Sequence, residues 1–346
     1  MRKDRYSGYR GRLSATDWLR RIAAVLAVLV VLVGGGLIAG QKFIVYTDGG
    51  LRVDLPFDRE DASEEELGEI TVVVEQPQPE PAPPVEEPEP PLRAIVLGVD
   101  SLLNGTALQQ VQAAGANAVV LNMKDDSGKL AYTSGSALAA EVGANTPAEG
   151  LEQALAALSE ADIRLIARVS CFRDHKLASN RSYAIDTKSG RRWVDSRSVR
   201  WSNPAKPGVA GYLMDIAKEL SDLGFDEVLL DNWGYPAQGD GRLDYIRQGE
   251  SYIPARLEML VGAFLSQMQA VLEEGECTLS LYCKAGTLTV LPDQSGRTLA
   301  QMGRINGRIW MENPAEGTLL PQQSQMVQLV TAFAQDNAAH QAIWTI

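Results

Sequence analysis

Residues 92–345 of this 346-residue chain alternate between short apolar runs and longer amphipathic segments, and this alternation constrains the fold more than any other feature. The order of strand followed by helix is typical of a parallel sheet whose strands are joined by helical crossovers. The pattern predicts seven strands, at 94–100, 117–124, 164–170, 227–231, 278–282, 308–312 and 341–345. It predicts helices at 106–114, 148–161, 207–223, 255–274, 296–302 and 322–337.

This order predicts a TIM-type (β/α)8-like barrel, the commonest closed arrangement of such units at this chain length. Seven strands leave the barrel one strand short. Either one strand has been missed in the pattern, or the barrel is incomplete, or another segment such as 43–55 closes it. A doubly wound open sheet is the alternative architecture.

The segment before residue 40 has the composition of a membrane anchor. Basic side chains outnumber acidic ones in residues 1–21, and residues 22–39 contain no charged side chain. A helix over 22–39 would span about 27 Å, close to the thickness of the hydrocarbon core of a bilayer. Because basic flanks stay in the cytoplasm, we expect a cytoplasmic tail at 1–21, a single-pass transmembrane anchor at 22–40 and an extracellular C-terminal domain at the cell membrane.

A cleaved signal peptide is the alternative for this segment, because it also places an apolar run after basic residues. The run here is longer than is usual for a signal peptide, and no Ala-x-Ala-like site follows it. We therefore favour the uncleaved anchor.

Two further segments separate the anchor from the barrel. Residues 41–57 carry an Asp-Gly-Gly turn at 48–50 between two short apolar runs, which predicts a juxtamembrane hairpin. Residues 58–91 are dominated by Glu, Asp and Pro, a composition that cannot bury enough apolar surface to fold and that stays extended. We expect a disordered acidic, Pro-rich stalk at 58–91 and the barrel domain at 92–346.

Charge and composition exclude several classes of function. The net charge of −12 argues against nucleic acid as a partner, because phosphates require a basic surface. Cys277 and Cys283 lie on one predicted strand and cannot pair without breaking it, so no disulfide framework is expected. The two histidines, His175 and His340, are too few and too far apart in sequence to suggest a metal site. We expect neither a metal nor an organic cofactor.

Polar side chains gather late on one face of six predicted strands. Alternate residues of a strand share a face, and this face carries Asp100, Asn122, Lys124, Arg168, Ser170, Asp231, Ser280, Tyr282, Arg308, Trp310 and Glu312. Burying so many polar groups is costly unless they pair or line a pocket. Because the active sites of such barrels lie at the C-terminal ends of the strands, we expect a substrate pocket there. A structural ion-pair layer inside the barrel is the alternative.

Two loops add candidates at the same end. The loop that follows the second strand contains Asp125 within a Lys-Asp-Asp-Ser-Gly turn. The loop from 171 to about 207 is unusually long for a compact domain, which favours a functional role, and it contains Asp174, Trp193 and Trp201. The two tryptophans are candidate sugar-stacking platforms, with local packing as the alternative.

Five motifs in this order resemble the putative glycoside hydrolase domain family (domain of unknown function 4015), which is grouped with the α-amylase-type TIM barrels. The resemblance covers roughly residues 94–345 and implies a TIM barrel that hydrolyses glycosidic bonds. The motifs are Asn122-Met-Lys-Asp-Asp-Ser-Gly-Lys129, Ile166-Ala-Arg-Val-Ser-Cys-Phe-Arg-Asp-His-Lys-Leu-Ala178, Trp193-Val-Asp195, Trp201-Ser-Asn-Pro204 and Leu223-Gly-Phe-Asp-Glu-Val-Leu-Leu-Asp231.

The chain departs from the family at two places. Family members usually continue the fourth strand as Asp-Tyr-Val-Arg-Phe-Pro, whereas here Asn232-Trp-Gly-Tyr235 stands between Asp231 and Pro236, without the arginine. In α-amylase-type barrels the strand-four Asp is the nucleophile and a Glu ending strand five is the acid. The fifth strand here ends in Tyr282-Cys283, so the nearest candidate acid is Glu312.

Glycoside hydrolysis needs one carboxylic acid and one carboxylate on either side of the scissile bond. We expect Asp231, near Arg168 and Lys124, to be the nucleophile or base, and Glu312, beside Trp310, to be the acid. The expected substrate-binding residues are Asp100, Lys124, Asp125, Arg168, Asp174, Trp193, Trp201, Asn232, Tyr235, Tyr282 and Trp310.

The sequence therefore predicts a membrane-anchored, extracytoplasmic glycoside hydrolase that acts on cell-wall or surface polysaccharide. A non-catalytic glycan-binding barrel and a structural envelope protein are the alternatives.

Overall fold

A computed structural model describes residues 44–47, 50–53, 90–237, 240–247, 254–284, 294–312, 325–334 and 339–344. The predicted cytoplasmic tail, the transmembrane anchor and almost all of the predicted stalk lie outside the described residues. Among the helices that are described, none combines the length and the apolar character needed to cross a membrane. Within the predicted hairpin segment, β1 (Ile44–Thr47) and β2 (Gly50–Val53) pair in antiparallel fashion.

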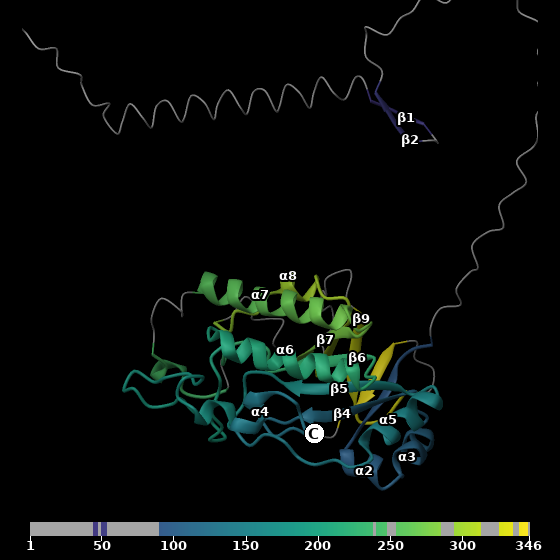
Figure 1. Cartoon of the computed structure of the whole chain (residues 1–346), viewed down its shortest axis with the longest axis horizontal. Coiled ribbons are helices and arrows are strands. Elements are labelled where there is room, and N and C mark those ends of the chain that lie inside the picture. Colours follow the sequence, from purple (N-terminus) through teal and green to yellow (C-terminus); the bar gives the residue numbers. More distant parts are fainter. Residues whose placement is uncertain are drawn as a thin grey trace, which may run out of the picture. The chain divides into compact units, whose positions relative to one another are not determined.

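Eight parallel strands form a closed barrel, which confirms the TIM-type prediction and excludes the open sheet (Figure 1). The barrel closes where β10 pairs with both β9 and β3, so the 43–55 segment is not needed for closure. The strands in order are β3 (Arg93–Leu97), β4 (Ala118–Lys124), β5 (Arg164–Ser170), β6 (Glu227–Asp231), β7 (Thr278–Cys283), β8 (Arg308–Glu312), β9 (Gln325–Val330) and β10 (His340–Ile343).

The strand that the sequence pattern missed is β9, so the predicted helix at 322–337 is wrong. Its apolar residues recur at 326, 327, 329 and 330, a spacing that also fits one face of a helix. In the barrel, Val327 packs into the interior, and β9 pairs with β8 on one side and β10 on the other. Tertiary pairing therefore overrides the local pattern.

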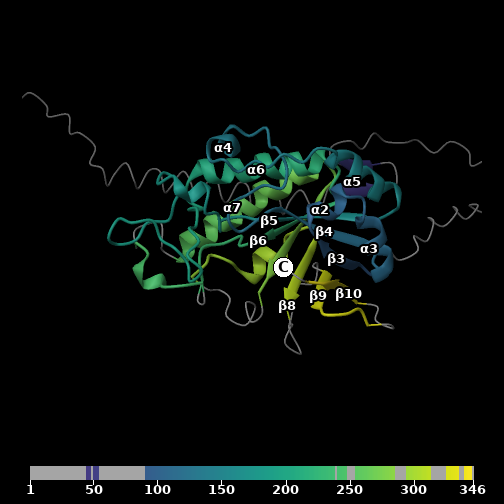
Figure 2. The ribbon, with the colours of Figure 1, turned by 90° about the horizontal axis from the view of Figure 1, so that it is seen from below.

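Four long helices cover the outside of the barrel on the β3 to β7 side (Figures 1 and 2). They are α3 (Ala107–Ala114), α5 (Leu151–Glu160), α6 (Pro207–Asp222) and α7 (Pro254–Glu273), all close to the predicted ranges. Shorter elements lie in the connections: α2 (Val99–Leu103), α4 (Ala137–Glu141), α8 (Leu299–Met302), η1 (Leu177–Ser179) and η2 (Leu243–Tyr245).

The period of two in the strands separates two cores, as predicted. Side chains such as Leu121 and Val228 point outward into the larger core beneath the helices. Side chains such as Val120, Ile166 and Leu229 point inward and fill the barrel. Arg168 and Asp231, which alternate in step with Ile166 and Leu229, therefore also point inward.

An ion-pair layer lies inside the barrel near the N-terminal ends of its strands. The fully buried Glu227 accepts hydrogen bonds from Arg308 Nη1 at 2.6 Å and Trp310 Nε1 at 2.9 Å, and its carboxylate lies 3.4 Å from Arg164 Nε. Arg308 and Trp310, two of the inward polar positions predicted from the sequence, are therefore paired within this layer. Trp310, expected to bind substrate, is fully buried and belongs to this layer.

Candidate functional site

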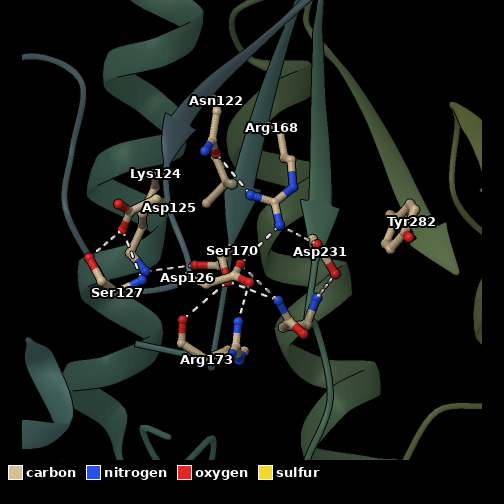
Figure 3. A network of polar contacts seen from close by, with 12 residues as sticks. Asn122, Lys124, Asp125, Asp126, Ser127, Arg168, Ser170, Arg173, Asp231 and Tyr282 are labelled. Carbon is tan, nitrogen blue, oxygen red and sulfur yellow. Dashed lines mark hydrogen bonds and ion pairs between the residues drawn. The ribbon is translucent and has the colours of Figure 1, made fainter. Parts of the chain in front are cut away.

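The centre of the site is the pair formed by Asp231, the last residue of β6, and Arg168 of β5. Asp231 pairs in register with Ser170, which brings its side chain beside Arg168 inside the barrel. Arg168 Nη2 donates to Asp231 Oδ2 at 2.5 Å, and the two side chains are 4% and 8% exposed (Figure 3). The backbone N–H of Asn232 donates to the other carboxylate oxygen at 2.6 Å. Both oxygens of Asp231 are therefore held in place.

Asp126, in the loop after β4, is the second carboxylate on Arg168. It accepts from Arg168 Nη2 at 2.9 Å and forms an ion pair with Arg173 (Figure 3). Burial acts to raise the pKa of Asp126, but the charges and hydrogen bonds of Arg168 and Arg173 outweigh it and hold the pKa below its usual value. Its side chain is 32% exposed. Asp126 is thus an ionised group that solvent can reach.

Asp125, predicted from sequence to bind substrate, lies in a turn instead. Its Oδ1 accepts from the backbone N–H groups of Ser127 at 2.9 Å and Lys129 at 2.8 Å, which is the hydrogen bonding of an Asx turn. A register shift between Asn122 and Lys124 at the end of β4 precedes this loop. A strict period of two cannot show which of two adjacent aspartates reaches the site, and the structure places Asp126 there.

Lys124 and Asp174 form a separate buried pair. Lys124 Nζ lies 2.8 Å from Asp174 Oδ2 and donates to the backbone oxygen of Ser170 at 2.6 Å, and both side chains are fully buried. Lys124 was expected to stabilise Asp231, but its ion pair is with Asp174. This pair supports the chain after β5 rather than presenting a charge to a ligand.

The charged form of Arg168 is strongly favoured. Burial acts to lower its pKa, but the carboxylates of Asp231 and Asp126 outweigh this effect and raise it. Arg168 Nη1 also donates to Asn122 Oδ1 at 2.8 Å. A single guanidinium therefore fixes one amide and two carboxylates.

Tyr282 of β7 is hydrogen-bonded to the candidate acid, Glu312 of β8. Its hydroxyl donates to Glu312 Oε1 at 2.5 Å. Burial, this hydrogen bond and the charges of Asp231 and Glu312 all raise the pKa of Tyr282. Since β7 lies between β6 and β8, about two strand spacings, or roughly 10 Å, separate the backbones that carry the two carboxyl groups. Asp231 and Glu312 therefore end two strands at the same end of the barrel, with Tyr282 on the strand between them.

Trp344, an aromatic residue outside the predicted set of site residues, completes this region. Its ring stacks on Tyr282 with centroids 5.2 Å apart and planes 9° apart, and it lies 6.1 Å from the Trp310 ring. Trp344 is half-buried, whereas Trp310 is fully buried. Partly exposed aromatic surface in this cluster thus belongs to Trp344, which directly follows β10, a position for which the sequence offers no local motif.

Asn232 has backbone φ 49°, in the left-handed region that asparagine tolerates better than most residues. Its Nδ2 donates to Ser170 Oγ at 2.9 Å and lies 3.4 Å from Asp126 Oδ1. This conformation directs the Asn232 backbone N–H onto Asp231. The predicted site residue Asn232 therefore lies in the centre of the network.

The two tryptophans of the long loop are almost fully buried. Trp193 and Trp201 are each 2% exposed and pack edge to face, with centroids 6.3 Å apart. Their indole N–H groups donate to Arg242 O at 3.0 Å and Asp195 Oδ2 at 3.2 Å. Both rings pack locally, and their predicted role in sugar stacking stays a prediction.

Two other predicted residues lie apart from the network. Asp100 belongs to α2 and is exposed, because β3 ends at Leu97, three residues earlier than the sequence suggested. Tyr235 is buried, and its hydroxyl donates to Asn203 Oδ1 at 3.0 Å. Within the described residues, no group of three or more His, Cys, Asp or Glu side chains could hold a metal ion.

One family model matches more than half of the chain. Residues 94–305 match domain of unknown function 4015, described as a putative glycosyl hydrolase domain. No curated protein sequence matches significantly.

Three similar solved structures share low identity with this chain. A hypothetical protein from Ruminiclostridium thermocellum is 24% identical over 54% of this chain and 96% of its own, with a TM-score of 0.47. Aspergillus fumigatus Ega3 in complex with galactosamine is 14% identical over 69% and 77%, with a TM-score of 0.39. A variant of the glycoside hydrolase domain of PelA from Pseudomonas aeruginosa is 15% identical over 64% and 67%, with a TM-score of 0.37.

Proposed function

This chain belongs to the family of putative glycosyl hydrolase domains (domain of unknown function 4015), and from that premise we propose that it hydrolyses glycosidic bonds with Asp231 and Glu312 as its two carboxyl groups. The observation that carries the proposal is that Asp231 and Glu312 end β6 and β8 of one barrel, and that Tyr282 of the intervening β7 is hydrogen-bonded to Glu312. Active sites of α/β barrels lie at this end.

Asp231 acts as the carboxylate of the pair. Arg168 and the Asn232 N–H hold its two oxygens, and the arginine keeps a positive charge beside it. In a retaining reaction Asp231 attacks the anomeric carbon, and in an inverting reaction it takes a proton from the attacking water. Its fixed orientation suits either role, because no side-chain rotation is required during the reaction.

Glu312 acts as the acid. Tyr282 donates to its Oε1, which leaves Oε2 to carry a proton and deliver it to the leaving oxygen. As the glycosidic bond breaks, the electron pair goes to that oxygen, and the proton from Glu312 neutralises it. Water then supplies the hydroxyl group at the anomeric carbon, and its remaining proton restores the acid, directly or through Asp231 according to the stereochemistry.

We also propose that the enzyme is held at the cell membrane with its barrel outside, where it acts on cell-wall or surface polysaccharide. The support for this is the basic segment 1–21, the uncharged segment 22–39 and the acidic, Pro-rich spacer that follows.

The test is release of reducing ends from a panel of bacterial and plant cell-wall polysaccharides by the whole chain in detergent. Asp231→Asn and Glu312→Gln should each lower kcat by at least about 1000-fold, with circular dichroism at the assay temperature showing that each variant is folded. If a substrate of the wild-type protein is cleaved equally well by both variants, the assignment is refuted. The anomer first released, read by NMR, distinguishes retention from inversion.

A second candidate is a glycan-binding barrel without turnover. The observation that favours it is the end of β7, where Tyr282 and Cys283 stand in place of the acid that α-amylase-type barrels carry. Binding of a polysaccharide without release of reducing ends, unchanged in Asp231→Asn, would establish this second function.

A further inference from the structure

A groove of about 760 Å³ lies between the loop after β5 and the loop after β6, beyond the same strand ends that carry Arg168 and Asp231. We propose that it binds the carboxylated sugars of an acidic polysaccharide, and this inference rests on the proposed function because it names the substrate class of that enzyme. The groove lies within residues 187–196 and 241–245. Its volume is in the range of pockets that hold small molecules or a few sugar units.

The charge of the groove is opposite to that of the chain. Four cationic side chains line it, from Lys188, Arg191, Arg192 and Arg242. The acidic residue among the lining residues is Asp195, which is buried and paired with Arg173 at 2.7 Å. Arg242 is also paired, with Asp244 at 3.1 Å. In a chain of net charge −12, such a local excess of positive charge favours an anionic ligand.

The surface between the cations is largely apolar. Val194 and Tyr245, both lining residues, are 44% and 51% exposed. The Arg242 guanidinium lies over the Tyr245 ring at 4.3 Å from its centroid. A flat aromatic side chain beside an arginine suits a sugar ring that carries a carboxylate, because the ring packs on the apolar surface and the carboxylate faces the guanidinium.

The walls of the groove are fixed before any ligand binds. The Lys188 N–H donates to Tyr245 O and the Arg247 N–H to Asp186 O, each at 2.8 Å. The indole of Trp193 donates to Arg242 O at 3.0 Å. These bonds join the two loops across the groove. A preformed groove loses little ordering entropy on binding.

A chain of ion pairs connects the groove to the candidate site. Asp195 binds Arg173, Arg173 binds Asp126, and Asp126 binds Arg168, which holds Asp231. The wall of the groove and the carboxylate of the site are therefore parts of one hydrogen-bonded network. A polysaccharide that occupies the groove lies on the substrate-facing end of the barrel, so the groove serves as a subsite for the substrate chain.

The pattern of cations favours acidic sugars over a nucleic acid. A phosphate backbone requires many basic contacts, and the overall negative charge of the chain opposes it. Here the cations border an apolar surface, which suits a sugar chain with carboxylates.

The test is affinity electrophoresis of the full chain in gels that contain polygalacturonate, alginate or hyaluronate, with dextran and galactan as neutral controls. We expect at least one polyuronate, and neither neutral polymer, to retard the protein, with weaker retardation as salt rises. Lys188→Gln/Arg191→Gln changes two exposed groove residues and should weaken the apparent Kd about tenfold. Lys206→Gln/Lys218→Gln removes the same charge from exposed residues that do not line the groove, and should bind as wild type does.

The proposal is overturned if no polyuronate retards the protein, if neutral polymers retard it equally, if both double variants behave alike, or if only single-stranded DNA is bound. The Asp231→Asn variant separates this inference from the proposed function. Retention of its polyuronate binding, together with unimpaired hydrolysis, would refute the catalytic assignment and leave the groove as a binding site. If the protein does not bind polyuronate in the groove but its hydrolysis still depends on Asp231, only the groove inference is refuted.

Discussion

Replacing Arg168 by glutamine tests whether the polar network at the end of the barrel depends on one buried cation. Arg168 donates to Asn122, Asp126 and Asp231, and its side chain is only 4% exposed. Removing one partner of a buried ion pair costs about 3–5 kcal/mol, because the remaining charge is left without compensation. Asp126 is partly exposed and solvent can replace some of its lost contact, so we expect about 3 kcal/mol.

The assay is urea unfolding at neutral pH, read by circular dichroism and tryptophan fluorescence. In a thermal scan, the same loss of about 3 kcal/mol would lower the unfolding temperature by roughly 10 °C for a domain of this size. Arg168→Gln/Asp231→Asn should recover at least about 1 kcal/mol relative to the sum of the single variants, since the buried carboxylate that needed the arginine is gone. Lys218→Gln, which breaks an exposed ion pair with Asp222, is the control and should leave the unfolding free energy unchanged.

The reasoning is refuted if Arg168→Gln costs less than about 1 kcal/mol, the value typical of exposed ion pairs. It is also refuted if the double variant shows no coupling. In either case the carboxylates at this end of the barrel would be solvated independently of the arginine, and Asp231 would not be held as proposed.

Three further predictions concern neighbouring residues. The pKa of Asp126 is lower in the folded state than in the unfolded state, so its contribution to stability is present above about pH 4 and is lost as the pH falls further. Below about pH 4, the unfolding free energy of Asp126→Asn should therefore fall less steeply with pH than that of wild type. Tyr282→Phe removes the donor to Glu312 and should lower kcat at least about tenfold with little change in KM, measured on the substrate found for the wild type. Asn232→Gly should be more stable than Asn232→Ala, because the backbone φ of Asn232 is 49° and alanine adds about 1 kcal/mol of strain there. The thermal unfolding midpoints of the two variants test this difference.

The sequence predicted the inward face of most strands because that inference needs only the period of two. It could not identify β9, whose residues fit a helical period equally well when read without their neighbours. This strand, β9, is recognisable only from its pairing with β8 and β10. The closed barrel therefore depends on a contact that no local pattern reveals.

The sequence also predicted part of the candidate site, because that part lies on regular strands. Asp231, Arg168 and Tyr282 end regular strands, so their position followed from periodicity. Asp126 was missed in favour of Asp125 because both lie beyond the end of β4, in a loop where the period of the strand no longer applies. Trp344 was missed because it stacks on a residue 62 positions earlier in the chain, a contact that exists only after the barrel closes.

The two charged layers of the barrel contain similar chemistry and differ in what can reach them. At the N-terminal ends of the strands, Glu227 is fully buried and satisfied by Arg308 and Trp310, so no ligand can approach it. At the other end, Asp126 is 32% exposed although it is bound to two arginines. Burial with full satisfaction indicates a structural role, whereas a fixed carboxylate that remains open to solvent is ready to act on a ligand. The sequence alone shows carboxylates and arginines in both layers, and only the fold separates the layer that supports the barrel from the one that faces a substrate.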